Sequence, residues 1–139
     1  LVLNLTDDIG SVMLDLRGFL DAISNLSLNA NQAIEERGQF SLSTHNIQLT
    51  EETARSLQLA PGDYALLLVS DTGRGMNEEI RNKVFEPFFS TMKDKGSGLG
   101  LSQVYAFTQN NEGAITVESD LGHGCKFSLY LEVTAISPW

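Results

Sequence analysis

The sequence predicts a two-layer α/β sandwich of the α+β kind, and three observations lead to this prediction. Residues 16–36 repeat apolar side chains at steps of three and four, as an amphipathic helix does. Residues 64–69 are continuously apolar, which is typical of a central strand that is buried on both faces of a sheet. Residues 125–133 are apolar at every second position, as in a strand with one core face. Helices and strands in this mixture pack as two layers around one core.

The size of the chain favours a single domain, which we expect to span residues 1–139. A domain of about this length buries roughly two-thirds of its unfolded surface, enough for a core without disulfides. The one cysteine allows no intrachain disulfide and fits an intracellular, reducing setting. The chain starts at Leu1 rather than at methionine, so we expect it to be a fragment of a longer protein.

The net charge of −9 disfavours one class of function. Binding to nucleic acid regardless of sequence needs clustered lysine and arginine, so we expect no nucleic-acid partner. Any anionic ligand must be bound by local backbone donors and a few cations. No apolar run approaches the ~20 residues of a membrane-spanning helix, so we expect no direct membrane contact for this domain.

The first elements are two short strands and a long helix. Apolar residues alternate over residues 1–5 and again over residues 12–14, around a turn at residues 6–10. The helix of residues 16–36 follows, and Gly38 is well placed to end it.

The next strand has an interruption in its pattern. Phe40 and Leu42 alternate, whereas Ile47 and Leu49 alternate in the opposite parity. A bulge or turn near residues 44–46 would account for this change, and we expect one there.

Turns and caps separate the remaining elements. A polar stretch closes with Pro61-Gly62-Asp63, just before the central strand. Asn77 is placed to cap a short helix whose first turn is acidic, as the helix dipole favours. After a loop of residues 87–95, a helix opens at a group of glycines and runs to about Asn110. Residues 114–119 have the pattern of a strand that precedes the last one.

Two asparagines share one face of the long helix, beside its apolar face. Asn25 and Asn29 are four residues apart, although asparagine is a mediocre helix former. They are either two solvent-exposed amides or ligands for a hard cation such as Mg²⁺, which prefers oxygen.

A loop that ends the central strand has the sequence DTGRGM. Asp71 is placed to accept a hydrogen bond from an exocyclic amine, which would select adenine and reject guanine. Gly73 and Gly75 have no Cβ, so the backbone can approach a ligand closely. An ordinary turn after a strand can have the same pattern, so this motif alone is weak.

A third motif, GSGLGLS, joins a loop to the helix that follows. Its glycines at positions 96, 98 and 100 fit neither a P-loop nor a dinucleotide fingerprint. A glycine-rich turn at a helix N-terminus presents backbone N–H groups to phosphate, and Lys93 and Lys95 lie beside it in the sequence. A flexible loop before a helix is the alternative interpretation.

Together, the motifs closely resemble those of one family, the catalytic ATP-binding domains of sensor histidine kinases. NLSLNANQA resembles the N box, DTGRGM the first glycine box, VFEPFFST the F box, GSGLGLS the second glycine box, and LGHGCKFSLYL the final Gly-x-Gly and strand. All five occur in the family's order and cover most of residues 16–131. The superfamily (GHKL) also includes gyrase, MutL and the large heat-shock chaperones.

The resemblance implies a Bergerat-type ATP-binding fold, with a mixed β-sheet covered on one face by three helices and ATP held between helices and a lid. It implies that Asn29 ligates Mg²⁺, that Asn25 lies beside the phosphates, and that Asp71 meets the adenine amine. Asn25 and Asn29 are then the catalytic candidates. The other candidates for nucleotide contact are Ala33 at the end of the N box; Gly73, Gly75 and Met76 at the adenine; Phe89, Ser90, Thr91 and Lys95 in a lid also anchored by Phe88; and Gly96, Ser97, Gly98, Leu99, Gly100, Leu101 and Ser102 at the phosphates.

Two positions depart from the family's pattern. Met92 stands where many relatives have lysine, and Lys93 follows it, so both Lys93 and Lys95 stay candidates for phosphate contact. Cys125 stands where threonine or serine is usual behind the adenine, and we interpret it as a small buried side chain.

The function implied by the resemblance is that of a protein-histidine kinase. Such a domain binds Mg-ATP and donates the γ-phosphate to a histidine of a separate dimerisation domain, in two-component signalling with a response regulator. His45 and His123 lie outside the family's acceptor pattern, so we expect the acceptor domain elsewhere in a parent protein. We expect a cytoplasmic domain, whether or not the parent is anchored in a membrane.

Two other functions stay open. GHKL-type ATPases carry a glutamate, four residues before the metal-binding asparagine, as the general base for water. Asn25 occupies that position here and cannot take a proton, which disfavours hydrolysis. The second alternative is an ATP-binding regulatory module without catalysis, against which the intact motifs speak only weakly.

Overall fold

The computed structural model describes residues 2–4, 16–33, 38–86 and 100–133. Within this part of the chain, five strands form one sheet in the order β1-β2-β3-β5-β4. β1 (Val2–Asn4) pairs in parallel with β2 (Phe40–Leu49), and the remaining neighbours, β3 (Gly62–Asp71), β5 (Cys125–Glu132) and β4 (Ala114–Ser119), pair antiparallel. The sheet is therefore mixed, as expected. The strand predicted at residues 12–14 and the turn before it lie outside the described residues.

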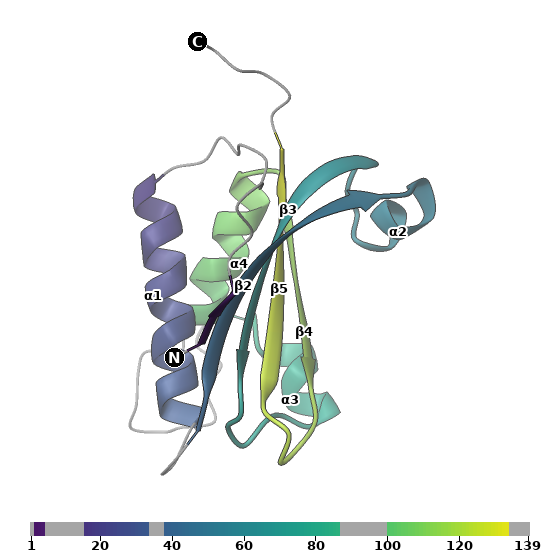
Figure 1. Cartoon of the computed structure of the whole chain (residues 1–139). Coiled ribbons are helices and arrows are strands. Elements are labelled where there is room, and N and C mark those ends of the chain that lie inside the picture. The colour runs from purple at the N-terminus through teal and green to yellow at the C-terminus, as the bar shows by residue number, and fades with distance from the viewer. Residues whose placement is uncertain (1, 5–15, 34–37, 87–99, 134–139) are drawn as a thin grey trace.

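Two long helices cover one face of this sheet and make the second layer (Figure 1). α1 (Leu16–Ala33) and α4 (Gly100–Asn110) run antiparallel beside each other, and the rings of Phe19 and Phe107 meet with their centroids 6.2 Å apart. The two-layer sandwich is therefore confirmed. None of the helices in the described ranges has both the length and the apolarity to span a membrane.

The main core lies between the sheet and these helices. Odd-numbered residues of β3, β4 and β5 point into it, so the alternation predicted for the last strand is confirmed. Its buried members are Ala22, Leu26, Leu67, Val69, Met76, Val84, Val104, Phe107, Ile115, Cys125, Phe127, Leu129 and Leu131. β3 is central, as predicted, but the prediction that it is buried on both faces is wrong. Leu66 and Leu68 are only half-buried, because α1 and α4 cover the other face.

A second, smaller core lies on the opposite face, at one end of the sheet. α2 (Glu51–Ser56) packs there over Leu49 and Tyr64, with Ala54 fully buried. This helix was not predicted, because its polar stretch lacks a helical apolar face. A local signal exists, since the Thr50 hydroxyl accepts a hydrogen bond from the N–H of Thr53 at 3.3 Å and caps the helix.

β2 contains no bulge, so that prediction is wrong. All ten of its residues pair with β3 in unbroken register. The apolar parity changes because the strand contributes to both cores. Phe40 and Leu42 pack against the main core, whereas Ile47 and Leu49 pack on the opposite face beneath α2.

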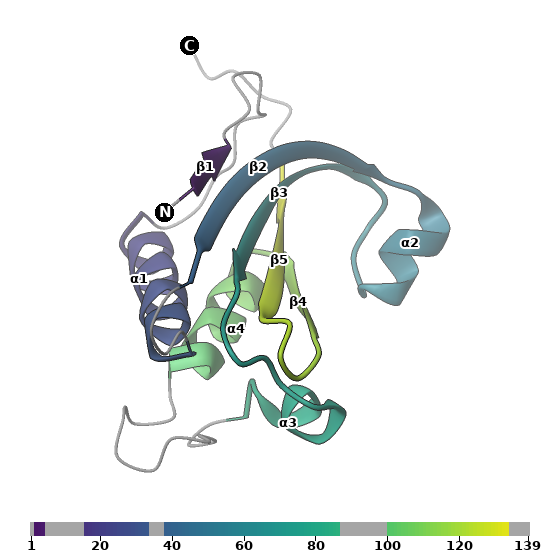
Figure 2. The same ribbon diagram turned by 60° about the horizontal axis from the view of Figure 1, so that its bottom comes forward.

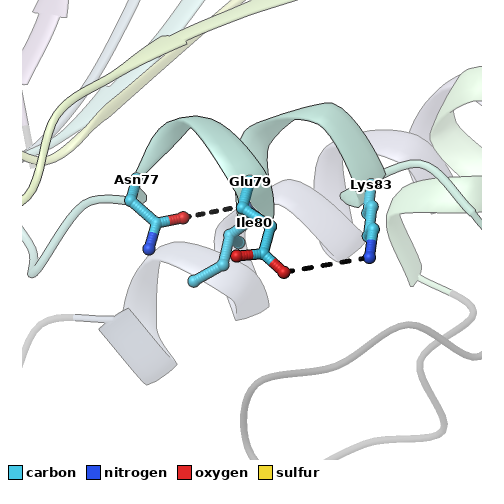
Figure 3. A network of polar contacts seen from close by, with 4 residues as sticks. All are labelled: Asn77, Glu79, Ile80 and Lys83. Carbon is cyan, nitrogen blue, oxygen red and sulfur yellow. Dashed lines mark hydrogen bonds and ion pairs between the residues drawn. The ribbon is translucent and has the colours of Figure 1, made fainter.

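α3 (Glu78–Lys83) begins at the predicted cap (Figure 3). Asn77 Oδ1 accepts a hydrogen bond from the N–H of Ile80 at 2.8 Å. Glu79 and Lys83 form an exposed ion pair with 4.0 Å between Oε1 and Nζ, which contributes little to stability. Ile80 also packs against the main core, so α3 lies at the end of the helical layer.

Candidate functional site

Most of the described candidate residues lie at one end of the sandwich. The loop after β3, the second half of α1 and the N-terminus of α4 all reach this end (Figure 1). Figure 2 turns this end toward the viewer, with α3 and the β4–β5 hairpin beside the loop. The site therefore has a helical side and a sheet side.

Asp71 is the central polar residue of the sheet side. It is the last residue of β3 and is only 7% exposed. Desolvation by burial raises the pKa of its carboxyl group, and hydrogen bonds from the N–H groups of Gly73 and Cys125 act in the lowering direction. The bond from Gly73 N to Asp71 Oδ1 is 2.8 Å long. A buried carboxylate is suited to accept a further N–H from a ligand, because bonding offsets the cost of its desolvation.

Two glycines allow the loop after β3 and the β4–β5 hairpin to touch. Gly75 has φ of +73°, and a Cβ at this position would collide with the carbonyl oxygen of Asp120. Gly124 has φ of +77°, and a Cβ there would collide with the carbonyl oxygen of Asp71. The sequence predicted that the backbone approaches a ligand closely at Gly75, and this stays a prediction; what the structure shows at Gly75 is a close approach to the hairpin backbone. Met76 follows in the main core.

Ser119 joins the loop to the hairpin, and the sequence analysis missed it. Its hydroxyl oxygen accepts a hydrogen bond from the N–H of Met76 at 2.7 Å and donates to the carbonyl oxygen of Gly124 at 2.6 Å. The same oxygen lies 3.3 Å from the sulfur of Cys125. Asp71, Cys125 and Ser119 are paired across three strands, so their side chains form a row on the helix-covered face. The available signal was the glycine turn between Ser119 and Cys125, which predicts that the two residues pair.

Asn25 is the central polar residue of the helical side. A Cβ added at Gly100 would lie 3.8 Å from the side chain of Asn25, so the predicted N box and second glycine box come into contact. Asn25 Nδ2 donates to Gln103 Oε1 at 3.3 Å, a second contact that the sequence analysis missed. Leu101 and Ser102 continue the first turn of α4. Backbone N–H groups at the N-terminus of a helix attract anions.

A cleft of about 440 Å³ runs between α1 and α4, and it does not coincide with the sheet side of the site. Its lining includes Asn25 and Gln103, but continues along the helices to Gly18 and Asn111 rather than to Asp71. The rest of its lining is Asp21, Ala22, Ala106, Phe107 and Asn110. We therefore centre the candidate site on the loop after β3 and the start of α4, where the polar contacts converge.

The other predicted contacts fall outside the described part of the chain. Asn29 and Ala33 belong to α1, but their side chains lie outside the described residues. The same holds for all of residues 87–99, which include Phe88, Phe89, Ser90, Thr91, Lys93, Lys95, Gly96, Ser97, Gly98 and Leu99.

The burial predicted for Cys125 is confirmed, and the two histidines lie in β2 and in the turn between β4 and β5. Cys125 is buried, and this burial raises the pKa of its thiol. His45 is in β2, with its Nε2 3.1 Å from the Ser43 hydroxyl. His123 is in the hairpin turn, where its N–H donates to the carbonyl oxygen of Asp120 at 3.0 Å.

The sequence profile of the histidine kinase-, DNA gyrase B- and HSP90-like ATPases matches residues 15–135. The chain belongs to this family. It is 38% identical over 126 residues to the sensor kinase CckA of Brucella abortus (strain 2308), covering 89% of this chain and 13% of that protein. It is 30% identical over 131 residues to sporulation kinase E of Bacillus subtilis (strain 168), covering 94% of this chain and 16% of that protein. The chain thus spans a small part of these relatives.

Solved structures of histidine kinases share the fold. The mycobacterial sensor histidine kinase MprB superposes with a TM-score of 0.75 at 24% identity, over 97% of this chain and 83% of that one. Full-length ShkA in complex with AMPPNP gives a TM-score of 0.75 at 24% identity, over 99% of this chain and 26% of that one. The fold of this chain is therefore that of the ATP-binding domain of histidine kinases.

Proposed function

We propose that this domain binds Mg-ATP and donates the γ-phosphate to a histidine of a separate dimerisation domain, from which a response regulator receives it. Relatives named as a sensor kinase and a sporulation kinase support the proposal, and this chain matches only 13% and 16% of their respective lengths. In this proposal the acceptor histidine belongs to another part of the parent protein. We propose a cytoplasmic location for this domain, where its substrate ATP is found.

The contact between Asn25 and the start of α4 is the observation that carries this proposal. An amide, rather than a carboxylate, lies against the helix N-terminus that is expected to bind the phosphates. An amide cannot take a proton from water, so the site offers no base for hydrolysis at this position. A histidine acceptor needs no such base, because neutral imidazole is already a nucleophile near pH 7.

The sheet side supports selection of adenine. Asp71 is a buried acceptor at the end of β3, and the exocyclic amine of adenine is a donor that suits it. Guanine lacks an amine at that position, so GTP would leave the carboxylate buried without a partner. We therefore expect ATP and ADP to bind, and GTP to bind poorly.

The proposal assigns Mg²⁺ to the helical side. Amide oxygens are hard ligands of the kind that this cation accepts, and Asn29 follows Asn25 by about one turn of α1. In this proposal Asn29 ligates the cation and Asn25 lies beside the phosphates. Bound Mg²⁺ would supply positive charge to offset that of the phosphates, while the residues of this chain orient the nucleotide toward the acceptor.

Incubation with radiolabelled ATP and Mg²⁺ tests the proposal. We expect no label on this chain alone, and acid-labile label on the acceptor when the dimerisation domain of the parent is added. The control is the same domain with its acceptor histidine changed to glutamine, which should stay unlabelled. Rapid ATP turnover by the isolated chain would favour the ATPase alternative, and ATP binding without transfer would favour a regulatory module without catalysis.

A further inference from the structure

We infer that Ser119 is a positioning residue that holds the loop of residues 72–76 in the shape that binds adenine. The inference rests on the proposed function, because adenine contact by Asp71 and this loop is part of that proposal. Ser119 acts here through the loop rather than by touching the nucleotide itself.

The hydroxyl of Ser119 is used as both acceptor and donor. It accepts from the N–H of Met76 at 2.7 Å and donates to the carbonyl oxygen of Gly124 at 2.6 Å. Ser119 is only 8% exposed, and Met76 is 9% exposed, so water is largely excluded from this bond. Removing the hydroxyl would leave a buried N–H without its acceptor, which costs more than an exposed bond would.

Ser119 also connects three parts of the molecule around the loop. The hairpin turn binds the loop through the N–H of Gly122, which donates to the carbonyl oxygen of Arg74 at 2.7 Å. The carbonyl oxygen of Ser119 accepts a hydrogen bond from Arg81 Nη1 at 2.6 Å, which joins α3 to the end of β4. Loop, hairpin and α3 therefore meet at this one residue.

Ser119 lies on the sheet side of the site, with Asp71, and not on the helical side that is proposed to bind the phosphates. Asp71 and Ser119 both flank Cys125 in the sheet, whereas Asn25 and Gly100 lie on the helices. Loss of the Ser119 hydroxyl should therefore loosen the adenine contacts and leave the phosphate contacts in place. The expected signature is a weaker preference for ATP over GTP, with unchanged binding of inorganic tripolyphosphate.

Nucleotide titration of Ser119→Ala tests the inference, with Ser128→Ala as the matched control. Ser128 is buried to a similar degree, at 7% exposed, but its side chain is on the opposite face of the sheet. The dissociation constant for GTP divided by that for ATP measures the preference for ATP. We expect Ser119→Ala to lower this ratio by at least about fivefold, which corresponds to the ~1 kcal/mol of one hydrogen bond. Ser128→Ala should leave this ratio unchanged, whatever it does to the melting temperature.

The outcomes separate this inference from the proposed function. A wild-type chain that binds GTP as well as ATP contradicts the proposed adenine site, whatever Ser119 does. If the wild type prefers ATP and folded Ser119→Ala has the same preference, the positioning role is wrong, even if the variant melts earlier. If Ser119→Ala does not fold, Ser119→Cys is titrated in its place with a reductant present, because a thiol is a weaker acceptor and the reductant prevents a disulfide with the neighbouring Cys125. A narrowed ratio then supports the inference, and an unchanged ratio overturns it.

Discussion

Asp71 is subject to two opposing requirements. The proposed contact with adenine uses its ionised form as an acceptor, whereas burial raises the pKa of the carboxyl group and so favours the neutral form. The folded state therefore holds the proton more tightly than the unfolded state does. It follows that Asp71 stabilises the fold most below its ordinary pKa of 3.8, and that this contribution is lost as pH rises through the raised pKa of the folded state.

Asp71→Asn should separate these two requirements. The amide oxygen can still accept from the N–H of Gly73, but the variant has no charge to desolvate. We compare the unfolding free energy of the variant with that of the wild type. The difference, variant minus wild type, should increase as pH rises from 3.8 through the raised pKa of folded Asp71, and should then level off. ATP affinity should fall roughly 10- to 100-fold, as the loss of a hydrogen bond to a charged group implies.

Urea unfolding at a series of pH values and nucleotide titration at neutral pH measure the two effects. Asp63→Asn is the control, since Asp63 is an exposed aspartate on the same strand and should not affect ATP affinity. A stability difference that stays flat or shrinks with rising pH would contradict the account of Asp71.

Individual site residues could be predicted from sequence where a local motif contains them. Asp71 and Gly75 belong to one short motif, and the structure places both at the loop after β3. Ser119 and Gln103 were missed, because their contacts join segments 43 and 78 residues apart. Contacts of this kind depend on which strands and helices become neighbours, and a short sequence window does not contain that information.

At the scale of elements, the β4–β5 hairpin supports the loop after β3 by direct backbone contact. Gly75 has φ of +73°, and a Cβ at this position would collide with the carbonyl oxygen of Asp120. Gly122 also has a positive φ, +84°, but a Cβ there would meet nothing within 4 Å. The two glycines therefore share a conformational requirement and differ in the space around them.

Gly75→Ala should destabilise the fold more than Gly122→Ala does. Both variants bear the cost of a left-handed backbone, about 1–2 kcal/mol, and only Gly75→Ala must also displace the hairpin. We expect weaker ATP binding for Gly75→Ala alone, since this displacement moves the loop that follows Asp71. Thermal unfolding and nucleotide titration of both variants check this. Equal losses for the two variants would mean that the contact with Asp120 has no importance.

Elements were predicted best where capping chemistry is local, and worst where two cores share one strand. Asn77 caps α3 as expected, and its bond to Ile80 spans only three residues. The bulge predicted in β2 is absent because Ile47 and Leu49 face the small core beneath α2. A change of parity has two explanations, a bulge or a change of the covered face. The two explanations can be distinguished only if α2 is known, and the polar sequence of α2 does not predict a helix.

At the scale of the whole molecule, the two cores have different relations to the site. The main core lies under α1 and α4 and includes Met76, which adjoins the site. The small core around Ala54 and Tyr64 lies on the opposite face, with α2 at the far end of the sheet from α3 (Figure 1). Stability lost in the small core should therefore have no specific effect on nucleotide binding.

Tyr64→Phe provides a test of this separation. The Tyr64 hydroxyl donates to the carbonyl oxygen of Ala60 at 2.7 Å, and its removal should cost about 1 kcal/mol of unfolding free energy. ATP affinity, and its ratio to GTP affinity, should stay at the wild-type values below the melting transition. A variant that loses affinity at such temperatures would show that the small core and the nucleotide site are coupled.

Cys125 has a consequence for chemical labelling. It is the only cysteine in the chain, it is 5% exposed, and burial disfavours the thiolate that reacts with alkylating reagents. The native fold therefore shields its one thiol, and a cysteine introduced at exposed Gln58, beside α2, could receive a single fluorophore without any change to Cys125. In the unaltered chain, alkylation requires the sheet to open beside Asp71. The rate of thiol modification would then report how often that end of the sheet opens, and a bound nucleotide should slow it.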